Sequence, residues 1–211
     1  MSGIEYFYSA HSAFAYLGSR RLIEIVEATG CELTHKPYDL SVGIKGAGSS
    51  STRERPQKYK DYFFRREIDR WAEFRNASIV QGYPTYHWSD ITIANCVLIA
   101  GTVAGQEVNS LAHAMLEGHW SEDLDLSNHH VLKTLMQDSG FDPEHLLKLA
   151  QTSEVYEIYE NNTKEAIDRS VFGSPTYFVD GDMFYGQDRL EMVERAISKP
   201  FNPSTYTSID G

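Results

Sequence analysis

Residues 171–185, VFGSPTYFVDGDMFY, are the stretch that decides the fold. Two short runs rich in aromatic and β-branched residues flank the dipeptide Asp180-Gly181, which favours a two-residue hairpin turn. Leu190, Val193 and Ile197 then recur at helical spacing. The stretch therefore predicts a strand–hairpin–strand–helix unit whose first strand follows Pro175 directly.

The other end of the chain predicts a complementary unit. Ile4–Tyr8 is a short run typical of a strand, and apolar residues at helical spacing follow from near Ser12. Gly30 stands where a helix commonly ends, and Leu33–Tyr38 predicts a second strand. Two β-rich ends that are too small for separate cores should pair into one sheet, which indicates an α/β fold.

The middle of the chain has helical signals and no convincing strand. Residues 41–52 are rich in Gly and Ser and predict a loop, and Ile91–Ala104 is apolar nearly all round, as in a buried helix. Asp142-Pro143 and Ser153 predict helix starts. The predicted division is a sheet domain from 1–52 and 166–198, a helical insertion over 53–165, and a loosely ordered tail over 199–211.

Composition excludes several classes of protein. Lys and Arg total 19 against 30 Asp and Glu, a net charge of −11, which argues against nucleic acid and anionic membranes as partners. No apolar run is long enough for a membrane span, and the N-terminus lacks signal-peptide features. The two cysteines, Cys31 and Cys96, exclude a disulfide scaffold and favour a reduced, cytoplasmic location.

The candidate site combines Pro175 with the start of the first helix. In the thioredoxin fold, this order of elements places a cis-proline beside that helix start, so we expect a cis Ser174–Pro175 bond rather than an ordinary trans turn. Free N–H groups at the helix start favour an anion near Ser12. Because no cysteine stands there, disulfide exchange at this position is impossible, and Ser12 is either a ligand donor or only the helix N-cap.

Two segments carry a resemblance to a known family. Residues 5–17 resemble the pattern D-F-Y-F-D…S-P-x-S-Y-L, and residues 171–190 resemble V-F-G-V-P-T-F…G-E-x-F-W-G-x-D-R-L. Both patterns belong to the 2-hydroxychromene-2-carboxylate isomerase family, which is related to kappa-class glutathione transferases in the DsbA-like branch of the thioredoxin superfamily. The resemblance implies a thioredoxin-like fold with a helical insertion, a homodimer, and glutathione as cofactor.

The resemblance also implies roles for particular residues. Ser12 matches the serine that binds the glutathione sulfur as a thiolate, and Ser174, before Pro175, matches the residue whose backbone pairs with the cysteinyl part. The turn Gly186-Gln187-Asp188-Arg189 matches the segment that receives the γ-glutamyl end. The residues alone leave a second interpretation of Asp188 open, a plain acidic residue in the first turn of a helix.

Other positions depart from the family pattern. Ala13 replaces a proline, Ser9 replaces an aspartate, and the family's substrate-binding lysine and asparagine have no clean match. The nearby cations Lys45, Arg53 and Arg55 are candidates for holding a substrate carboxylate, and the alternative is a solvated basic surface that also includes Lys58 and Lys60.

The histidines do not predict a metal site. His113, His119 and His129-His130 lack the spacing of a helical ligand pair and are interpreted as surface residues. The predicted function is a glutathione-dependent isomerase acting on a small aromatic unsaturated acid. The alternatives are a transferase or peroxidase that uses the same thiolate on another electrophile, and a redox-inactive binding module.

Overall fold

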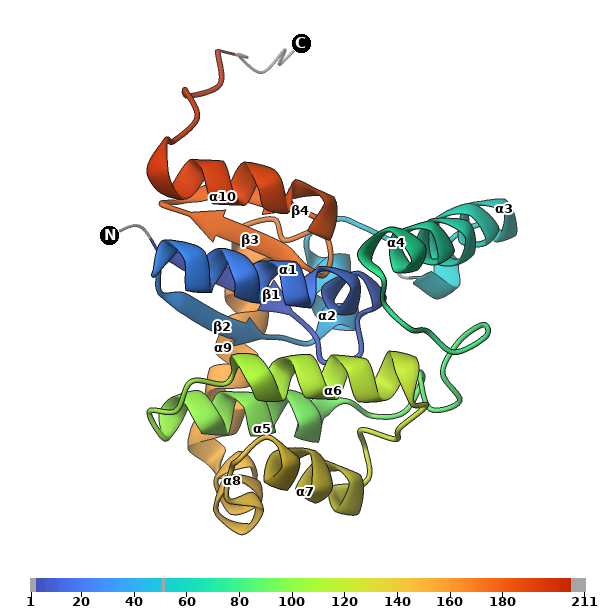
Figure 1. Ribbon diagram of the computed structural model, residues 1–211, viewed down its shortest axis with the longest axis vertical. Coiled ribbons are helices and arrows are strands. Elements are labelled where there is room, and N and C mark those ends of the chain that lie inside the picture. Colours follow the sequence, from blue (N-terminus) through green and yellow to red (C-terminus); the bar gives the residue numbers. More distant parts are fainter. Residues whose placement is uncertain (1–2, 51, 206–211) are drawn as a thin grey trace.

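The computed structural model describes residues 3–50 and 52–205, so residues 1–2 and the part of the predicted tail at 206–211 lie outside it. One mixed sheet has the strand order β2-β1-β3-β4 (Figure 1). Its strands are β1 Ile4–Tyr8, β2 Leu33–Pro37, β3 Thr176–Val179 and β4 Asp182–Tyr185. β1 runs parallel to β2 and antiparallel to β3, which confirms that the two ends of the chain share one sheet.

Helices cover both faces of this sheet. α1 (Ala13–Thr29) and α10 (Leu190–Ser198) lie on one face, and α9 (Ser153–Asp168) lies on the other with α2 (Leu40–Gly46) (Figure 1). The alternation of strand side chains explains this arrangement. Tyr6 and Tyr177 stack at 5.3 Å within the cluster that includes residues of α1 and α10, whereas Phe7 and Phe178 pack with Ala166 of α9.

The remaining helices lie between the two halves of the sheet in the chain. α5 to α8 gather below the sheet on the β2 side, and α3 and α4 project to the right of the sheet (Figure 1). Their bounds are η1 Thr52–Glu54, α3 Gln57–Asp61, a π-helical turn Tyr62–Arg66, α4 Glu67–Arg75, α5 Thr92–Val103, α6 Asn109–Ser121, α7 His129–Asp138 and α8 Pro143–Ala150. No helix of the described residues is long and apolar enough to cross a membrane.

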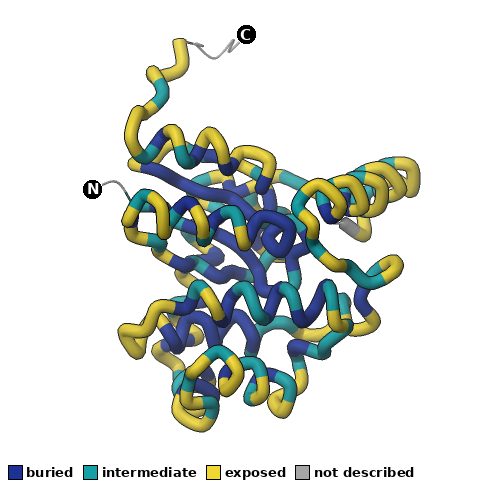
Figure 2. Tube along the Cα trace, viewed as in Figure 1, coloured by how far each residue is buried: buried dark blue, intermediate teal, exposed yellow. Residues whose placement is uncertain are grey.

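α5 is the central helix of the insertion and is buried over most of its length, as predicted (Figure 2). Its only buried side-chain amide among the described residues is Asn95, which is fully buried in an otherwise apolar segment. α8 begins at Pro143 with Asp142 as its N-cap, as predicted.

Some sequence-based expectations were wrong. The loop predicted over 41–52 contains the helix α2 (Leu40–Gly46), with Asp39 as its N-cap. Gly43 packs closely against Tyr38, since a Cβ at this position would lie 2.5 Å from the Tyr38 ring. This glycine therefore marks close packing rather than a loop. The N-cap of α9 is Thr152 rather than Ser153, since Thr152 accepts the Val155 N–H. Helix α7 was not predicted.

Candidate active site

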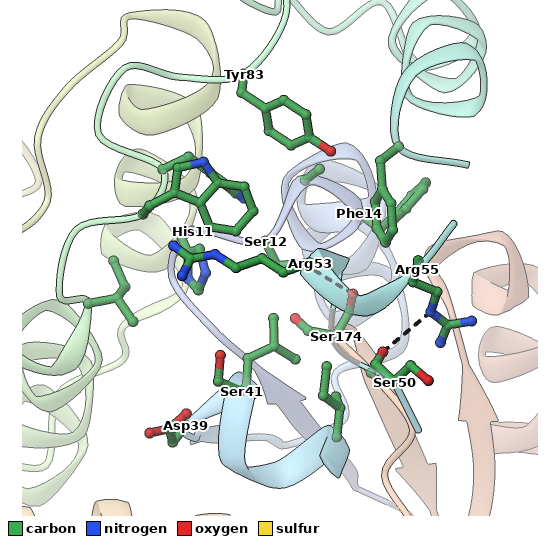
Figure 3. Close-up of a pocket in the computed structure, with 18 of the residues that line it drawn as sticks. His11, Ser12, Phe14, Asp39, Ser41, Ser50, Arg53, Arg55, Tyr83 and Ser174 are labelled. Carbon is green, nitrogen blue, oxygen red and sulfur yellow. Dashed lines mark hydrogen bonds between the residues drawn. The ribbon is translucent and has the colours of Figure 1, made fainter. Parts of the chain in front are cut away.

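Ser12 stands at the N-terminus of α1 and makes two hydrogen bonds. Its Oγ accepts the N–H of Ala15 at 3.3 Å, so Ser12 is the helix N-cap. The same hydroxyl donates to the carbonyl oxygen of Ser174 at 3.0 Å (Figure 3). Ser12 is therefore both a cap and a donor directed at the loop before β3.

The Ser174–Pro175 bond is cis, as predicted. The Ser174 side chain is fixed as well, because its Oγ accepts the backbone N–H of Ser9 at 3.2 Å. Ser12 and Ser174 are 162 positions apart in the chain, and the pairing of β1 with β3 brings them into contact.

Ser12 and Ser174 line a cavity of about 490 Å³, a size suited to a small-molecule ligand. In Figure 3, Tyr83 and Phe14 lie on one side of this space, and Ser41 and Asp39 lie on the other. The aromatic lining residues are Phe14, Tyr59, Phe63, Phe64, Tyr83, Trp88, Trp120, Tyr159, Phe172 and Tyr185. The wall therefore combines polar groups near α1 with a large aromatic surface.

The three candidate cations also line this cavity. Lys45 pairs with Glu54 at 3.2 Å, and the Arg53 guanidinium lies 4.7 Å from the centre of the Trp88 ring. The Arg55 guanidinium lies 4.6 Å from the Tyr59 ring centre, and its Nε donates to the Ser50 carbonyl (Figure 3). Tertiary structure thus brings positive charge into the same cavity as Ser12.

The turn over residues 186–189 takes a different place. Among the described residues that line the cavity, none belongs to this turn, although the adjacent Tyr185 does. Gln187 is buried and accepts hydrogen bonds from the Arg75 guanidinium, and the Asp188 carboxylate pairs with Arg189 at 2.6 Å. Gly186 has a φ of 101°, a conformation that favours glycine.

A buried polar network that sequence reasoning missed lies beneath Ser12. The Asn95 side chain accepts the N–H of Ala10 at 2.9 Å and donates to Ser9 Oγ at 3.2 Å. Ser9 Oγ lies 3.0 Å from Nδ1 of His11, which lines the cavity. The available signal was a single amide in an apolar helix, because a buried amide needs polar partners.

Three histidines form a cluster next to this network. His87 Nδ1 lies 3.2 Å from His119 Nε2, and the His11 and His87 ring centres are 5.2 Å apart. Burial lowers the pKa of His11 to about 4 and of His87 to about 2, and it also lowers the pKa of His119. The expectation that His119 is a surface residue was wrong, since this side chain is 1% exposed. No group of residues in the described part of the chain is arranged to hold a metal ion.

A comparison with known protein families identifies the family to which this fold belongs. Residues 3–198 match the DsbA-like thioredoxin domain. The chain belongs to this family. The match covers both the sheet and the helices between its halves, which confirms the predicted fold class.

Particular DsbA-like relatives are also similar over nearly the whole chain. A 2-hydroxychromene-2-carboxylate isomerase of Sphingobium xenophagum is 25% identical over 192 residues, 90% of this chain and 95% of that protein. One of Pseudomonas putida is 25% identical over 197 residues, 93% and 94% of the two chains. A solved structure of such an isomerase superposes with a TM-score of 0.75 at 23% identity, covering 93% of this chain and 94% of its own, and shows the shared fold. The resemblance seen in the sequence is confirmed, and it supports an enzyme of the isomerase kind.

The two cysteines of this DsbA-like protein lie away from the candidate site. Cys31 and Cys96 are both free and buried, and burial raises the pKa of the Cys96 thiol to about 11. Neither residue lines the cavity. A buried thiol that stays protonated is a poor nucleophile, so any sulfur chemistry in the cavity requires a thiol brought by a ligand.

Proposed function

We propose that this protein is a glutathione-dependent isomerase that acts on an aromatic unsaturated acid of the 2-hydroxychromene-2-carboxylate type. The observation that carries the proposal is the Ser12 hydroxyl, held at the N-terminus of α1 and directed at the Ser174 carbonyl inside the cavity. A helix N-terminus lowers the pKa of a nearby thiol, so a glutathione sulfur placed here gains thiolate character. We place this activity in the cytoplasm and expect a homodimer.

Binding of the sulfur would exchange one hydrogen bond for two. In the structure the Ser12 hydroxyl donates a hydrogen bond to the Ser174 carbonyl oxygen at 3.0 Å. Rotation of the hydroxyl toward a thiolate would free that carbonyl to accept an N–H from the cysteinyl residue of glutathione. The same exchange explains how Ser12 and Ser174 act together, one on the sulfur and the other on the peptide.

Other residues of the cavity wall suit the proposed substrate. Phe14, Phe63 and Trp88 supply aromatic surface for a ring, and Arg53 and Lys45 supply positive charge for a carboxylate. The thiolate adds to a conjugated carbon, the bond made single rotates, and loss of the thiolate restores the double bond in the other isomer. The protein contributes orientation and charge, and glutathione contributes the nucleophile.

The proposal is tested with Ser12→Ala. Removing one hydrogen bond to a charged sulfur, worth about 1.5–3 kcal/mol, raises the thiol pKa by about one to two units, so the glutathione-dependent rate at neutral pH falls about tenfold or more. The measurements are conversion of 2-hydroxychromene-2-carboxylate with and without glutathione, and far-ultraviolet thiolate absorbance of bound glutathione against pH.

Ser41→Ala provides the matched control, since Ser41 lines the same cavity and takes no part in the hydrogen bonds that Ser12 and Ser174 make with described residues. The thiol pKa in this variant should equal that of the unmodified protein. Equal thiol pKa values in Ser12→Ala and the unmodified protein would make Ser12 a helix cap only. Turnover that does not require glutathione would refute the proposed cofactor.

A further inference from the structure

The orientation of the Asn95 amide fixes the direction of a chain of hydrogen bonds beneath the cavity. The Ala10 N–H donates, so the Asn95 atom that faces it at 2.9 Å is the oxygen, and the amide nitrogen faces Ser9. Ser9 Oγ therefore accepts a hydrogen bond from the Asn95 amide N–H. The side chains of Ser9 and Asn95 are fully buried, so each of their N–H and O–H groups needs a hydrogen-bond partner within the protein.

The hydroxyl proton of Ser9 then determines the tautomer of His11. Among the described residues, the remaining hydrogen-bond partner of Ser9 Oγ is Nδ1 of His11 at 3.0 Å. Ser9 donates to Nδ1, which must be unprotonated to accept. Neutral His11 therefore carries its proton on Nε2.

The His11 ring is held in place and stays neutral. Its backbone carbonyl accepts the indole N–H of Trp120 at 2.8 Å, and its ring packs at 5.2 Å from His87. Burial lowers its pKa to about 4, so the ring is uncharged at neutral pH. Its Nε2 makes no hydrogen bond with any described residue, and the side chain lines the cavity next to Ser12.

We propose that His11 is a catalytic residue that donates a hydrogen bond from Nε2–H to the carbonyl oxygen of the unsaturated substrate. The proposal rests on the proposed function. Opening of the cyclic hemiketal breaks the bond from C2 to the ring oxygen, moves the 2-hydroxyl proton to that oxygen and leaves the carbonyl. Addition of the thiolate to this open form makes a C–S bond, and the double-bond electrons move onto the carbonyl oxygen as an enolate. Expulsion of the thiolate reverses both changes, so no proton or electron is gained or lost in the cycle.

A neutral, preorganised donor fits this step. The enolate is transient and must return its electrons to the carbon chain, so a donor that keeps its own proton stabilises it without trapping it. Asn95 and Ser9 do not touch the substrate in this scheme. They are positioning residues that hold the His11 tautomer, in the way that outer partners orient functional histidines.

The test compares His11→Leu, which removes the donor, with His11→Gln, whose side-chain amide supplies an N–H near the position of Nε2. Conversion of 2-hydroxychromene-2-carboxylate is measured at saturating glutathione. The kcat of His11→Leu should fall about 100-fold, the usual effect of removing one oxyanion donor, and His11→Gln should recover about tenfold of that loss. Glutathione affinity, measured by calorimetry, should change less than about twofold, and the thiol pKa should change by less than about 0.3. Both stay nearly constant because His11 acts after the thiolate has formed.

Nitrogen-15 NMR of the unmodified protein tests the tautomer independently. The expected result is an unprotonated Nδ1 and a protonated Nε2 for His11 at neutral pH. A protonated Nδ1 would overturn the inference. If His11→Leu does not fold by circular dichroism, His11→Phe, which keeps a ring against His87, replaces it in the same comparison.

The outcomes separate this inference from the function on which it rests. An unmodified protein that neither binds glutathione nor converts the substrate refutes both. An unmodified protein that does both, with His11→Leu at the same kcat, refutes the role of His11 alone. A fall in kcat that His11→Gln does not restore, accompanied by an equal loss of glutathione affinity, would make His11 a structural residue and overturn the proposal.

Discussion

At the scale of single residues, the site depends on polar groups whose partners are remote in the chain. Ser12 donates to the Ser174 carbonyl, and Asn95 holds the backbone of Ala10. Leaving a buried donor or acceptor without its partner costs about 1–3 kcal/mol. These contacts therefore contribute to stability as well as to the geometry that the proposed chemistry needs.

The buried histidines predict a loss of stability in mild acid. Burial holds the pKa of folded His87 at about 2, below the ordinary value of about 6.5 expected in the unfolded chain. As the pH falls through about 6.5, the unfolded chain takes up a proton that the folded protein does not, so stability is full above this pH and declines below it. Between about pH 7 and about pH 5 this costs about 2 kcal/mol for one such histidine.

His87→Gln should remove this share of the acid sensitivity. Urea unfolding at the two pH values should show the variant losing about 2 kcal/mol less than the unmodified protein. His145→Gln, at an exposed position outside the cluster, should behave like the unmodified protein. Identical pH dependence in all three proteins would show that His87 gains its proton equally in both states.

At the scale of secondary-structure elements, α2 shows how close packing positions a cavity wall. Gly43 lies against the Tyr38 ring, while Leu40, Ser41 and Lys45 of the same helix line the cavity. The helix can approach the core this closely only because position 43 lacks a Cβ. The missing side chain at position 43 therefore determines where α2 forms the wall of the cavity.

Gly43→Ala should destabilise the protein. Inside a helix, alanine is normally better than glycine by about 0.5–1 kcal/mol. Here the added Cβ would lie 2.5 Å and 2.8 Å from ring atoms of Tyr38, and overpacking of this kind costs about 1–3 kcal/mol. We expect a net loss of about 1–2 kcal/mol in chemical unfolding, since the clash outweighs the helix preference.

A double-mutant cycle provides the control. In the Tyr38→Leu background the ring is gone, so Gly43→Ala should cost at least 1 kcal/mol less, about the size of couplings between touching residues. An unchanged cost in both backgrounds would show that the strain at position 43 does not come from the ring.

At the scale of the whole molecule, the cavity lies between the sheet and the helices of the insertion. Its lining comes from the α1 start and residues 172–174 of the sheet domain, and from α3, the segment 83–92 and Trp120 between the two halves of the sheet. Asn162 of α9 also donates to the Pro37 carbonyl at 3.0 Å, which ties a helix to the sheet. A ligand in this cavity would contact both parts and stabilise them together.

Glutathione should therefore raise the melting temperature of the entire protein. A ligand at about 100 times its Kd adds about 2.7 kcal/mol to stability. For a chain of this size each kcal/mol corresponds to about 2–4 °C, so we expect an increase of about 5–10 °C in differential scanning calorimetry.

The matched ligand control is γ-glutamyl-alanyl-glycine, which lacks only the sulfur. If Ser12 binds the thiolate, this peptide should raise the melting temperature less than glutathione does. The same increase from both peptides would place the sulfur away from Ser12, and no increase from either would exclude glutathione as a ligand.

The sequence by itself determined the order and type of the main elements. Local signals suffice for this, because a hairpin at Asp180-Gly181, the helix start at Asp142-Pro143 and the apolar segment of α5 depend on neighbouring residues. The same local patterns placed Ser12 at a helix start and Pro175 before a strand. They could not distinguish a glycine that packs against a ring from one in a loop, which is why α2 was missed.

The order of elements already predicted that Ser12 and Ser174 share a site, but only the tertiary structure showed their contacts and the further residues that join them. The contact between Ser12 and Ser174 and the chain from Asn95 through Ser9 to His11 join segments that are far apart in sequence. No local periodicity records such contacts, because they depend on how β1 pairs with β3 and how α5 packs beneath them. Burial of the histidines, and with it the lowered pKa of His11, likewise arises only when the helices close around the sheet.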